Sequence, residues 1–325
     1  MISDPESVEK SLKKMPEGPV KEDIKRRLEY QKEVDYALEL IKIAEEDLES
    51  SKILFENKKY PNSVSSFQQS VEKSTKAFFL LNEILKSREL QKAVGHFPSK
   101  KHLEGVRASR EKAIGLKKAI DNNPKLKEIP MIKKLDLKDF LNKATEAEKI
   151  IKSVSKNGKI YSDNPEILDQ NLSEMGKLLL HAEEFEAKKL DKLTGEKLAN
   201  EWVSNIKAVS KIKREEGSEI SEQEEKEALS VTGEFLKHLA LRNAESMIYG
   251  GTSHAINFTL NFFVEPHFNF LRYPCKKNPL ECYTLKNPLV ERLPKFIKIQ
   301  RRNLDIHKKY LEFIKNSFAD VVIEG

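Results

Sequence analysis

The sequence predicts an all-α protein, and its composition and hydrophobic spacing both support this prediction. Charged residues make up 34% of the 325 residues, and glycines number only 12. Most of the charged residues are Lys and Glu, which favour helices and are depleted in strands. With 38% hydrophobic residues, a chain of this length can fill one large core or two smaller ones. Apolar residues recur at helical spacing along most of the chain, and this spacing shows where each helix lies.

The first 105 residues predict a charged arm followed by two antiparallel helices. Residues 1–28 are charged, interrupted by prolines and poor in apolar residues, which indicates a loose or separately helical arm. From Val34 to Phe55, apolar residues recur every three, four or seven positions, as on one face of a helix. Pro61 ends this helix, since proline disfavours the helical conformation of the residue before it. A second helix is predicted at 62–85, and the short connection makes the two helices antiparallel neighbours.

The middle of the chain, residues 106–240, predicts an inserted helical region. Its charged sequence carries apolar stripes at helical spacing, interrupted near positions 122–124, 130, 157–158, 165 and 215–218. It has no fixed repeat period, which argues against a solenoid. Several amphipathic helices are the simplest interpretation, and we expect Trp202 in their core rather than exposed as a stacking surface.

Residues 241–325 predict an aromatic segment, a structured loop and a long closing helix. Prolines at positions 274, 279, 288 and 294 define the loop at 272–288. The closing helix is predicted at about 289–318, because Leu293, Ile297, Leu304, Leu311 and Phe318 fall on one helical stripe.

Charge, cysteine content and motifs narrow the functional classes. The formal charge of +6 comes from 58 basic and 52 acidic residues, which permits a nucleic-acid partner without requiring one. Cys275 and Cys282 are too few for a disulfide scaffold, and their spacing does not fit a zinc site. No phosphate-binding glycine loop occurs, and we expect neither a cofactor nor a metal. No apolar stretch reaches the length of a signal peptide or a membrane span, so we expect a cytoplasmic protein with no membrane partner.

The segment YPNSVSSFQQSVEKSTKAFFLLNEI, followed by GHFPSKKH, resembles the middle of a HEPN domain. The residues that carry the resemblance, in order, are Tyr60, Gln68, Gln69, Glu72, Lys73, Lys76 and His96. A second element of the family, Arg-Tyr-Pro before a long closing helix, is matched at 272–274. The resemblance implies a HEPN-like helical bundle made of residues 29–105 and 241–325, with the helical region 106–240 inserted between its two parts.

Some HEPN proteins are metal-independent ribonucleases that carry an Arg, a polar residue, three further residues and a His. Arg302, Asn303 and His307 fit this pattern. The histidine would take the proton of a ribose 2′-hydroxyl, and the arginine would stabilise the charged phosphorane. Five residues turn a helix by about 140°, so Arg302 and His307 share a face only if the helix is distorted or two copies pair.

Two observations keep a structural role for His307 open. The histidine shares a stripe with Leu304 and Leu311, which is typical of a buried core or interface residue. The Arg-Tyr-Pro form of the domain also resembles HEPN proteins that lack the nuclease motif.

Further side chains are candidates for nucleic-acid or nucleotide binding. His96 follows a glycine at a predicted helix start, where backbone amides attract anions, although a loop-capping role is the favoured explanation. Pairs of basic residues could follow a phosphate backbone, or could simply be solvated. The predicted binding residues are His96, Lys100, Lys101, His267, Arg272 and Arg301.

Two hypotheses of function follow. The first is a HEPN-like protein, expected to be a homodimer, that acts on RNA in defence or stress response, with Arg302 and His307 as an endoribonuclease centre. The second is a non-catalytic HEPN module that binds a nucleotide, a nucleotidyltransferase or another protein through the aromatic face at 262–273. The first requires both side chains to face one cleft, whereas the second requires an exposed apolar patch.

Overall fold

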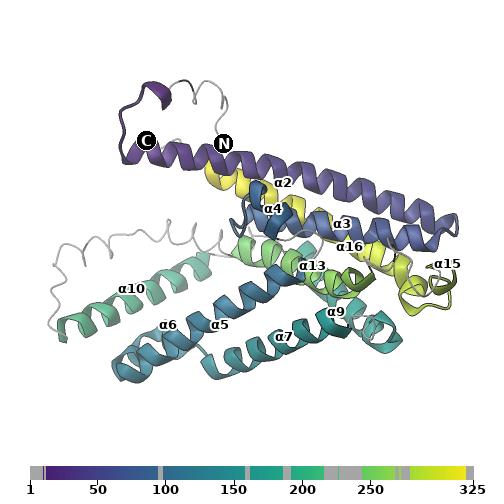
Figure 1. The fold of residues 1–325 in the computed structure, drawn as a ribbon. Helices are drawn as coiled ribbons and strands as arrows, with labels where there is room; N and C mark the ends of the chain where they lie inside the picture. The colour runs from purple at the N-terminus through teal and green to yellow at the C-terminus, as the bar shows by residue number, and fades with distance from the viewer. Residues whose placement is uncertain are drawn as a thin grey trace. The chain divides into compact units, whose positions relative to one another are not determined.

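The computed structural model in Figure 1 describes residues 10, 12–93, 98–157, 162–185, 192–215, 226, 244–267, 271 and 279–319. Across these ranges the chain forms helices and the turns between them, with no strand, which confirms the predicted all-α class. The chain divides into two compact units. Unit 1 comprises Met1–His102, Ser153–Glu184 and Ser246–Gly325, and unit 2 comprises Leu103–Lys152 and Phe185–Glu245.

Unit 1 begins with a long antiparallel hairpin of α2 (Pro19–Glu56) and α3 (Tyr60–Leu81) (Figure 1). At the end of α2, Lys58 adopts a φ of 58°, and the backbone amides of Lys58 and Lys59 bond back to Phe55 and Leu54. This double closure is a Schellman motif, which ends a helix sharply. The hydroxyl of Ser51 donates to the Ser63 carbonyl at 2.8 Å, and that of Ser63 donates to the Ser51 carbonyl at 2.7 Å. The hairpin predicted from the sequence is therefore present.

Three further helices complete the bundle of unit 1: α9 (Pro165–Glu184), α13 (Gly251–Val264) and α16 (Pro288–Ala319). Buried aromatic rings join segments that are far apart in the sequence. The ring centroid of Phe296 on α16 lies 6.3 Å from that of Phe67 on α3 and 5.8 Å from that of Phe263 on α13. All three side chains are at most 1% exposed. Helix α9 also belongs to unit 1, although it lies within the range 106–240 predicted as the insertion.

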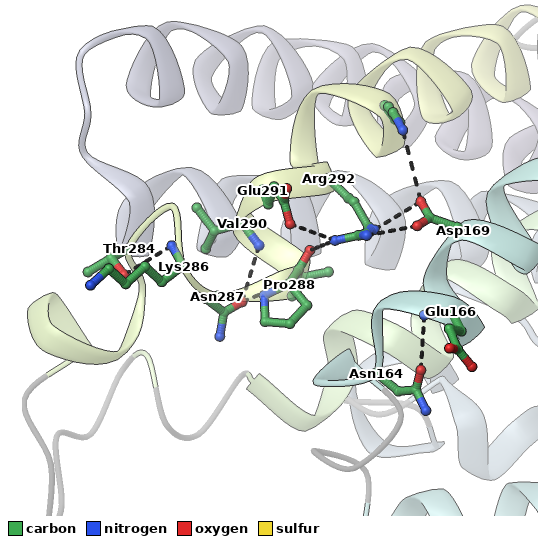
Figure 2. A network of polar contacts seen from close by, with 12 residues as sticks. Asn164, Glu166, Asp169, Thr284, Lys286, Asn287, Pro288, Val290, Glu291 and Arg292 are labelled. Carbon is green, nitrogen blue, oxygen red and sulfur yellow. Dashed lines mark hydrogen bonds and ion pairs between the residues drawn. The ribbon is translucent and has the colours of Figure 1, made fainter.

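Asparagine caps fix the starts of α9 and α16 (Figure 2). The side-chain oxygen of Asn287 accepts the backbone amides of Leu289 and Val290, at 3.0 and 3.2 Å. Asn164 caps α9 in the same way. Each asparagine precedes a proline, which suits the first helical position because it has no amide hydrogen to satisfy. One turn into α16, Arg292 donates two hydrogen bonds to Asp169 on α9, at 2.9 and 2.7 Å, and so ties the two helix starts together.

Unit 2 is also helical. Its main elements are α5 (Ser99–Asn122), η1 (Pro124–Glu128), α6 (Pro130–Lys133), α7 (Leu137–Asn157) and α10 (Lys192–Glu215). On α7, Glu148 is paired with Lys152 at 2.8 Å and with Arg107 and Arg110 of α5 at 3.0 and 2.8 Å, and these cations lower the pKa of its carboxyl to about 2. Trp202 on α10 is 39% exposed, so the expectation that it fills a core was wrong. Among the described helices of both units, none is long and apolar enough to cross a membrane.

Gly250 allows a close approach that alanine would not. It ends the π-helical turn η3 (Ser246–Gly250), and an added Cβ would lie 2.9 Å from the ring of Tyr310 on α16. We expect Gly250→Ala to lower the free energy of unfolding by about 1–3 kcal/mol, because the buried ring must shift. Urea unfolding followed by circular dichroism measures this change.

The neighbouring glycine provides a matched control. A Cβ at Gly251 would meet no atom within 4 Å. Since alanine favours a helix over glycine by about 1 kcal/mol, Gly251→Ala should leave stability unchanged or raise it. Equal destabilisation by the two substitutions would contradict the packing explanation.

Candidate functional site

Helix α16 presents a stripe of polar residues to the interior of unit 1. Gln300, Asn303, His307 and Tyr310 recur at steps of three and four, which places them on one face. The first three are fully buried, and Tyr310 is 4% exposed. Buried polar groups are normally hydrogen-bonded, so the stripe requires partners on the neighbouring helices.

Helix α3 and the residue that follows it supply the first set of partners. Gln300 lies 3.5 Å from the Ser70 hydroxyl, and His307 Nδ1 lies 3.4 Å from the Ser74 hydroxyl. The hydroxyl of Tyr310 donates to the side-chain oxygen of Asn82 at 2.8 Å. These contacts follow the same order along both segments, so α3 and α16 run in the same direction.

Helix α13 supplies the second set, centred on Asn257. Its side-chain oxygen accepts the Ser74 hydroxyl at 3.0 Å and the Asn303 amide at 2.9 Å, which joins three helices at one atom. One turn later, Asn261 donates to Thr75 at 2.6 Å. We call this set of residues the polar layer. Its members are Ser70, Ser74, Thr75, Asn257, Asn261, Gln300, Asn303 and His307.

Two more histidines lie in the same interior. The ring of His254 stacks on Phe78 at 4.8 Å between centroids, and the ring of His102 lies 5.0 Å from that of His254. Phe78 also contacts His307, at 6.3 Å. Burial lowers the pKa of His102 and of His307 to about 3, and it lowers the pKa of His254 as well. All three imidazoles are therefore neutral at pH 7.

Several polar atoms of this interior have no hydrogen-bond partner among the described residues. They are both ring nitrogens of His102, Nδ1 of His254, Nε2 of His307, the Ser253 hydroxyl, the Asn257 side-chain nitrogen and the Asn303 side-chain oxygen. Such atoms cost about 1–3 kcal/mol each when buried and unpaired. They retain the capacity to bind water or a polar ligand.

Arg302 lies outside this interior. Its guanidinium donates two hydrogen bonds of 2.7 Å to Glu183 on α9, and this pairing raises the pKa of the arginine. The side chain is 28% exposed and lines a shallow groove of about 480 Å³ together with Asp169, Lys295 and Lys298. His307, by contrast, is fully buried. Arg302 and His307 therefore do not face a common cleft.

The other predicted binding residues occupy separate places. Arg301 is exposed and pairs with Glu49 on α2 at 2.5 Å. His267 is fully buried, and its ring nitrogens contact the Tyr283 hydroxyl at 2.5 Å and the Ser162 hydroxyl at 2.8 Å. Neither of its nitrogens is thus available to a nucleic acid.

The remaining predicted positions divide between α5 and parts of the chain outside the described residues. Lys100 is exposed and Lys101 half-buried in the first turn of α5. His96 and Arg272 lie outside the described residues, as do Tyr273 and Pro274 of the Arg-Tyr-Pro element.

The aromatic face proposed as a docking surface is largely covered where the structure describes it. Phe263 and Val264 are each 1% exposed, and Phe262 packs against the core with its ring 5.4 Å from that of Phe263. This part of the segment forms the interior of the bundle.

Gln68, Glu72, Lys73 and Lys76, which carried part of the family resemblance, lie on α3. Gln68 and Glu72 are 2% and 6% exposed, and Glu72 accepts a hydrogen bond of 2.6 Å from Lys76. Lys73 forms an ion pair with Asp47 on α2. Of these contacts, the pair of Lys73 and Asp47 joins α3 to α2.

Sequence reasoning missed the polar face of α13. Ser253, Asn257 and Asn261 follow one another at steps of four within a segment otherwise rich in aromatic and aliphatic residues. That spacing was visible in the sequence and indicates one helical face. The described residues contain no group of three or more His, Cys, Asp or Glu that could hold a metal ion.

Comparisons with known proteins support the family resemblance. Residues 37–156 match the HEPN domain model, which confirms the resemblance inferred from the sequence. The match runs from α2 to the last turn of α7 and covers just over a third of the chain. A Methanocaldococcus jannaschii protein with the name "Putative toxin" is 46% identical over 61 residues, or 19% of this chain. These residues cover 40% of that relative, and no solved structure matches the chain.

The burial of His307 predicts a pH-dependent stability. Its pKa is about 3 in the folded protein, against about 6.5 in an unfolded chain. Between these values the unfolded chain binds more protons, so stability is lost as the pH falls below the unfolded pKa. Glu265 acts in the opposite direction, because burial raises the pKa of its carboxyl from 4.5 to about 7.

A His307→Gln variant isolates the histidine, since Glu265 contributes to both proteins alike. Between about pH 7 and about pH 5, wild type should lose roughly 2 kcal/mol more of its free energy of unfolding than the variant does. Urea unfolding at the two pH values measures the difference. The same pH dependence in both proteins would contradict a neutral, buried His307.

Proposed function

We propose that this protein is a toxin-like HEPN protein that acts on RNA. The HEPN match and the local similarity to a protein with "toxin" in its name support this general function. The finer form of the proposal is metal-independent cleavage of RNA by Arg302 and His307 on α16.

One observation carries the catalytic form: His307 is neutral and keeps one ring nitrogen without a partner among the described residues. A neutral imidazole is the state needed to take a proton from a 2′-hydroxyl. Arg302, five residues earlier, lines the groove that also contains Lys295 and Lys298, where a phosphate could bind. Because His307 is fully buried, cleavage requires α16 to rotate or move away from α3, or to rearrange when two copies pair.

The same burial favours a second candidate. His307 and Asn303 complete a polar layer that fixes α16 between α3 and α13, and Arg302 serves as an ion-pair partner of Glu183. These roles are sufficient for a non-catalytic HEPN module that binds a nucleotide, a nucleotidyltransferase or another protein. The name of the relative also makes an antitoxin a reasonable partner to test.

Cleavage of a mixed RNA panel in EDTA tests the catalytic form. We expect wild type to cleave RNA, and Arg302→Ala and His307→Gln each to lower the rate at least about a hundredfold, because each removes a group needed in the transition state. Gel analysis of labelled RNA measures the rates.

Although Arg301 was predicted to bind nucleic acid, it pairs with Glu49 and does not line the groove of Arg302, so the adjacent Arg301 provides the matched control. Like Arg302, it pairs with a single glutamate, but it lies on the side of α16 that faces α2. Arg301→Ala should cleave as wild type does, and circular dichroism should show that every variant is folded. No cleavage by wild type, or equal cleavage by all variants, would support the non-catalytic module instead.

A further inference from the structure

Unit 2 contains a hollow of about 590 Å³ bounded by the end of α5, η1, α6 and the start of α7. Four lysines and one carboxylate line it, and all five side chains are exposed. They are Lys117, Lys127, Lys133, Lys138 and Asp121. Cations therefore outnumber anions around this hollow.

The floor of the hollow is apolar. Ile120 is 5% exposed, and the half-buried side chains of Ile132, Leu137 and Leu141 adjoin it. Leu135, also in the lining, is 47% exposed and extends this apolar surface. The hollow thus combines a charged rim with an uncovered apolar surface.

The four lysines of the rim differ from other lysines of unit 2 in whether they form ion pairs. Lys125 in η1 and Lys134 at the end of α6 pair with Glu215 and Glu201 on α10, and Lys211 on α10 pairs with Glu128 of η1. None of the four rim lysines forms an ion pair with any residue in the described part of the chain. Their charge is therefore available to a ligand.

We infer that this hollow binds single-stranded RNA, with the rim lysines contacting phosphates and the apolar floor contacting bases. Lysine ammonium groups act as flexible point charges that follow a phosphate backbone. The apolar side chains of Ile120, Leu137 and Leu141 in the lining offer a surface on which a base can lie. The Asn142 amide, also in the lining, can bond to a base edge.

The choice of RNA rests on the proposed function, but the site is distinct from the α16 motif. An unpaired nucleic-acid strand presents phosphates and flat apolar faces together, which matches the rim and the floor. A duplex conceals its base faces, and an acidic peptide has no such faces to place on the floor. The site therefore predicts a preference for single strands over duplexes and over acidic polymers.

Binding of fluorescently labelled 2′-O-methyl RNA by the full chain tests this inference. That probe lacks the 2′-hydroxyl needed for cleavage, so anisotropy reports binding whether or not α16 is catalytic. Replacing Lys117, Lys127 and Lys138 by glutamine should weaken binding at least about tenfold at moderate salt. The slope of log K against log salt should also become shallower by about 2, because each phosphate that a lysine neutralises contributes roughly 0.7 to it.

A control variant removes the same number of lysine charges from unit 1. Lys42, Lys52 and Lys177 are exposed lysines of unit 1 that pair with glutamates on their own helices. Replacing these three by glutamine should change binding by less than about threefold and leave the salt slope nearly unchanged. Leu135→Ser should weaken binding several-fold with the wild-type salt slope, because it alters the floor and not the charge.

Three results would overturn the inference: no binding of single-stranded RNA by wild type, equally weakened binding by the two triple variants, or equal affinity for polyglutamate. Cleavage of ordinary RNA without binding at the hollow would leave the α16 proposal intact and remove this one. Binding at the hollow without cleavage would leave this inference intact and contradict the catalytic proposal for α16.

Discussion

The bundle of unit 1 depends on the hydrogen bonds of one buried amide. The side-chain oxygen of Asn257 accepts from Ser74 and from Asn303, and so connects α3, α13 and α16, whose residues are up to 229 positions apart in the chain. Aliphatic side chains tolerate several packings, whereas the hydrogen bonds of a polar layer form in only one register. Sliding α16 by one turn would leave these groups unpaired inside the core, at about 1–3 kcal/mol each. The amide therefore selects one arrangement among those that the apolar residues permit.

The same register decides what the Arg-x-x-x-x-His motif can do. With Asn303 directed at Asn257, His307 lies one turn further along the same face, and Arg302 must face away toward α9. The rotation of α16 thus separates the two residues of the motif: His307, the potential base, is buried and neutral, whereas Arg302 lies at the surface. Any chemistry that uses both groups requires the polar layer to open, and the stability of that layer would set the energy needed.

Much of unit 1 was predictable, because helical periodicity identifies which side of a helix is buried. The closing helix was expected at 289–318 and is found at Pro288–Ala319, whereas the second helix was expected at 62–85 and ends at Leu81. Periodicity does not reveal what a buried face meets, so the contacts of His307 with Ser74 and of His267 with Tyr283 and Ser162 could not be foreseen. Both histidines were predicted as site residues from their chemistry, and the fold encloses both.

The net charge of the sequence was a weak predictor of nucleic-acid binding, because it counts cations that pair with carboxylates and cations that do not alike. On α16, Arg292, Arg301, Arg302 and Lys308 each have a carboxylate partner on α9 or α2. Their charge is therefore largely neutralised where it lies, and α16 presents less positive potential than its sequence implies. The four lysines around the hollow of unit 2 form no ion pair with the described residues, so their charge is not neutralised by a neighbouring carboxylate there. If both proposals hold, the lysines of the hollow in unit 2 contact the phosphate backbone, and α16 supplies the groups for cleavage.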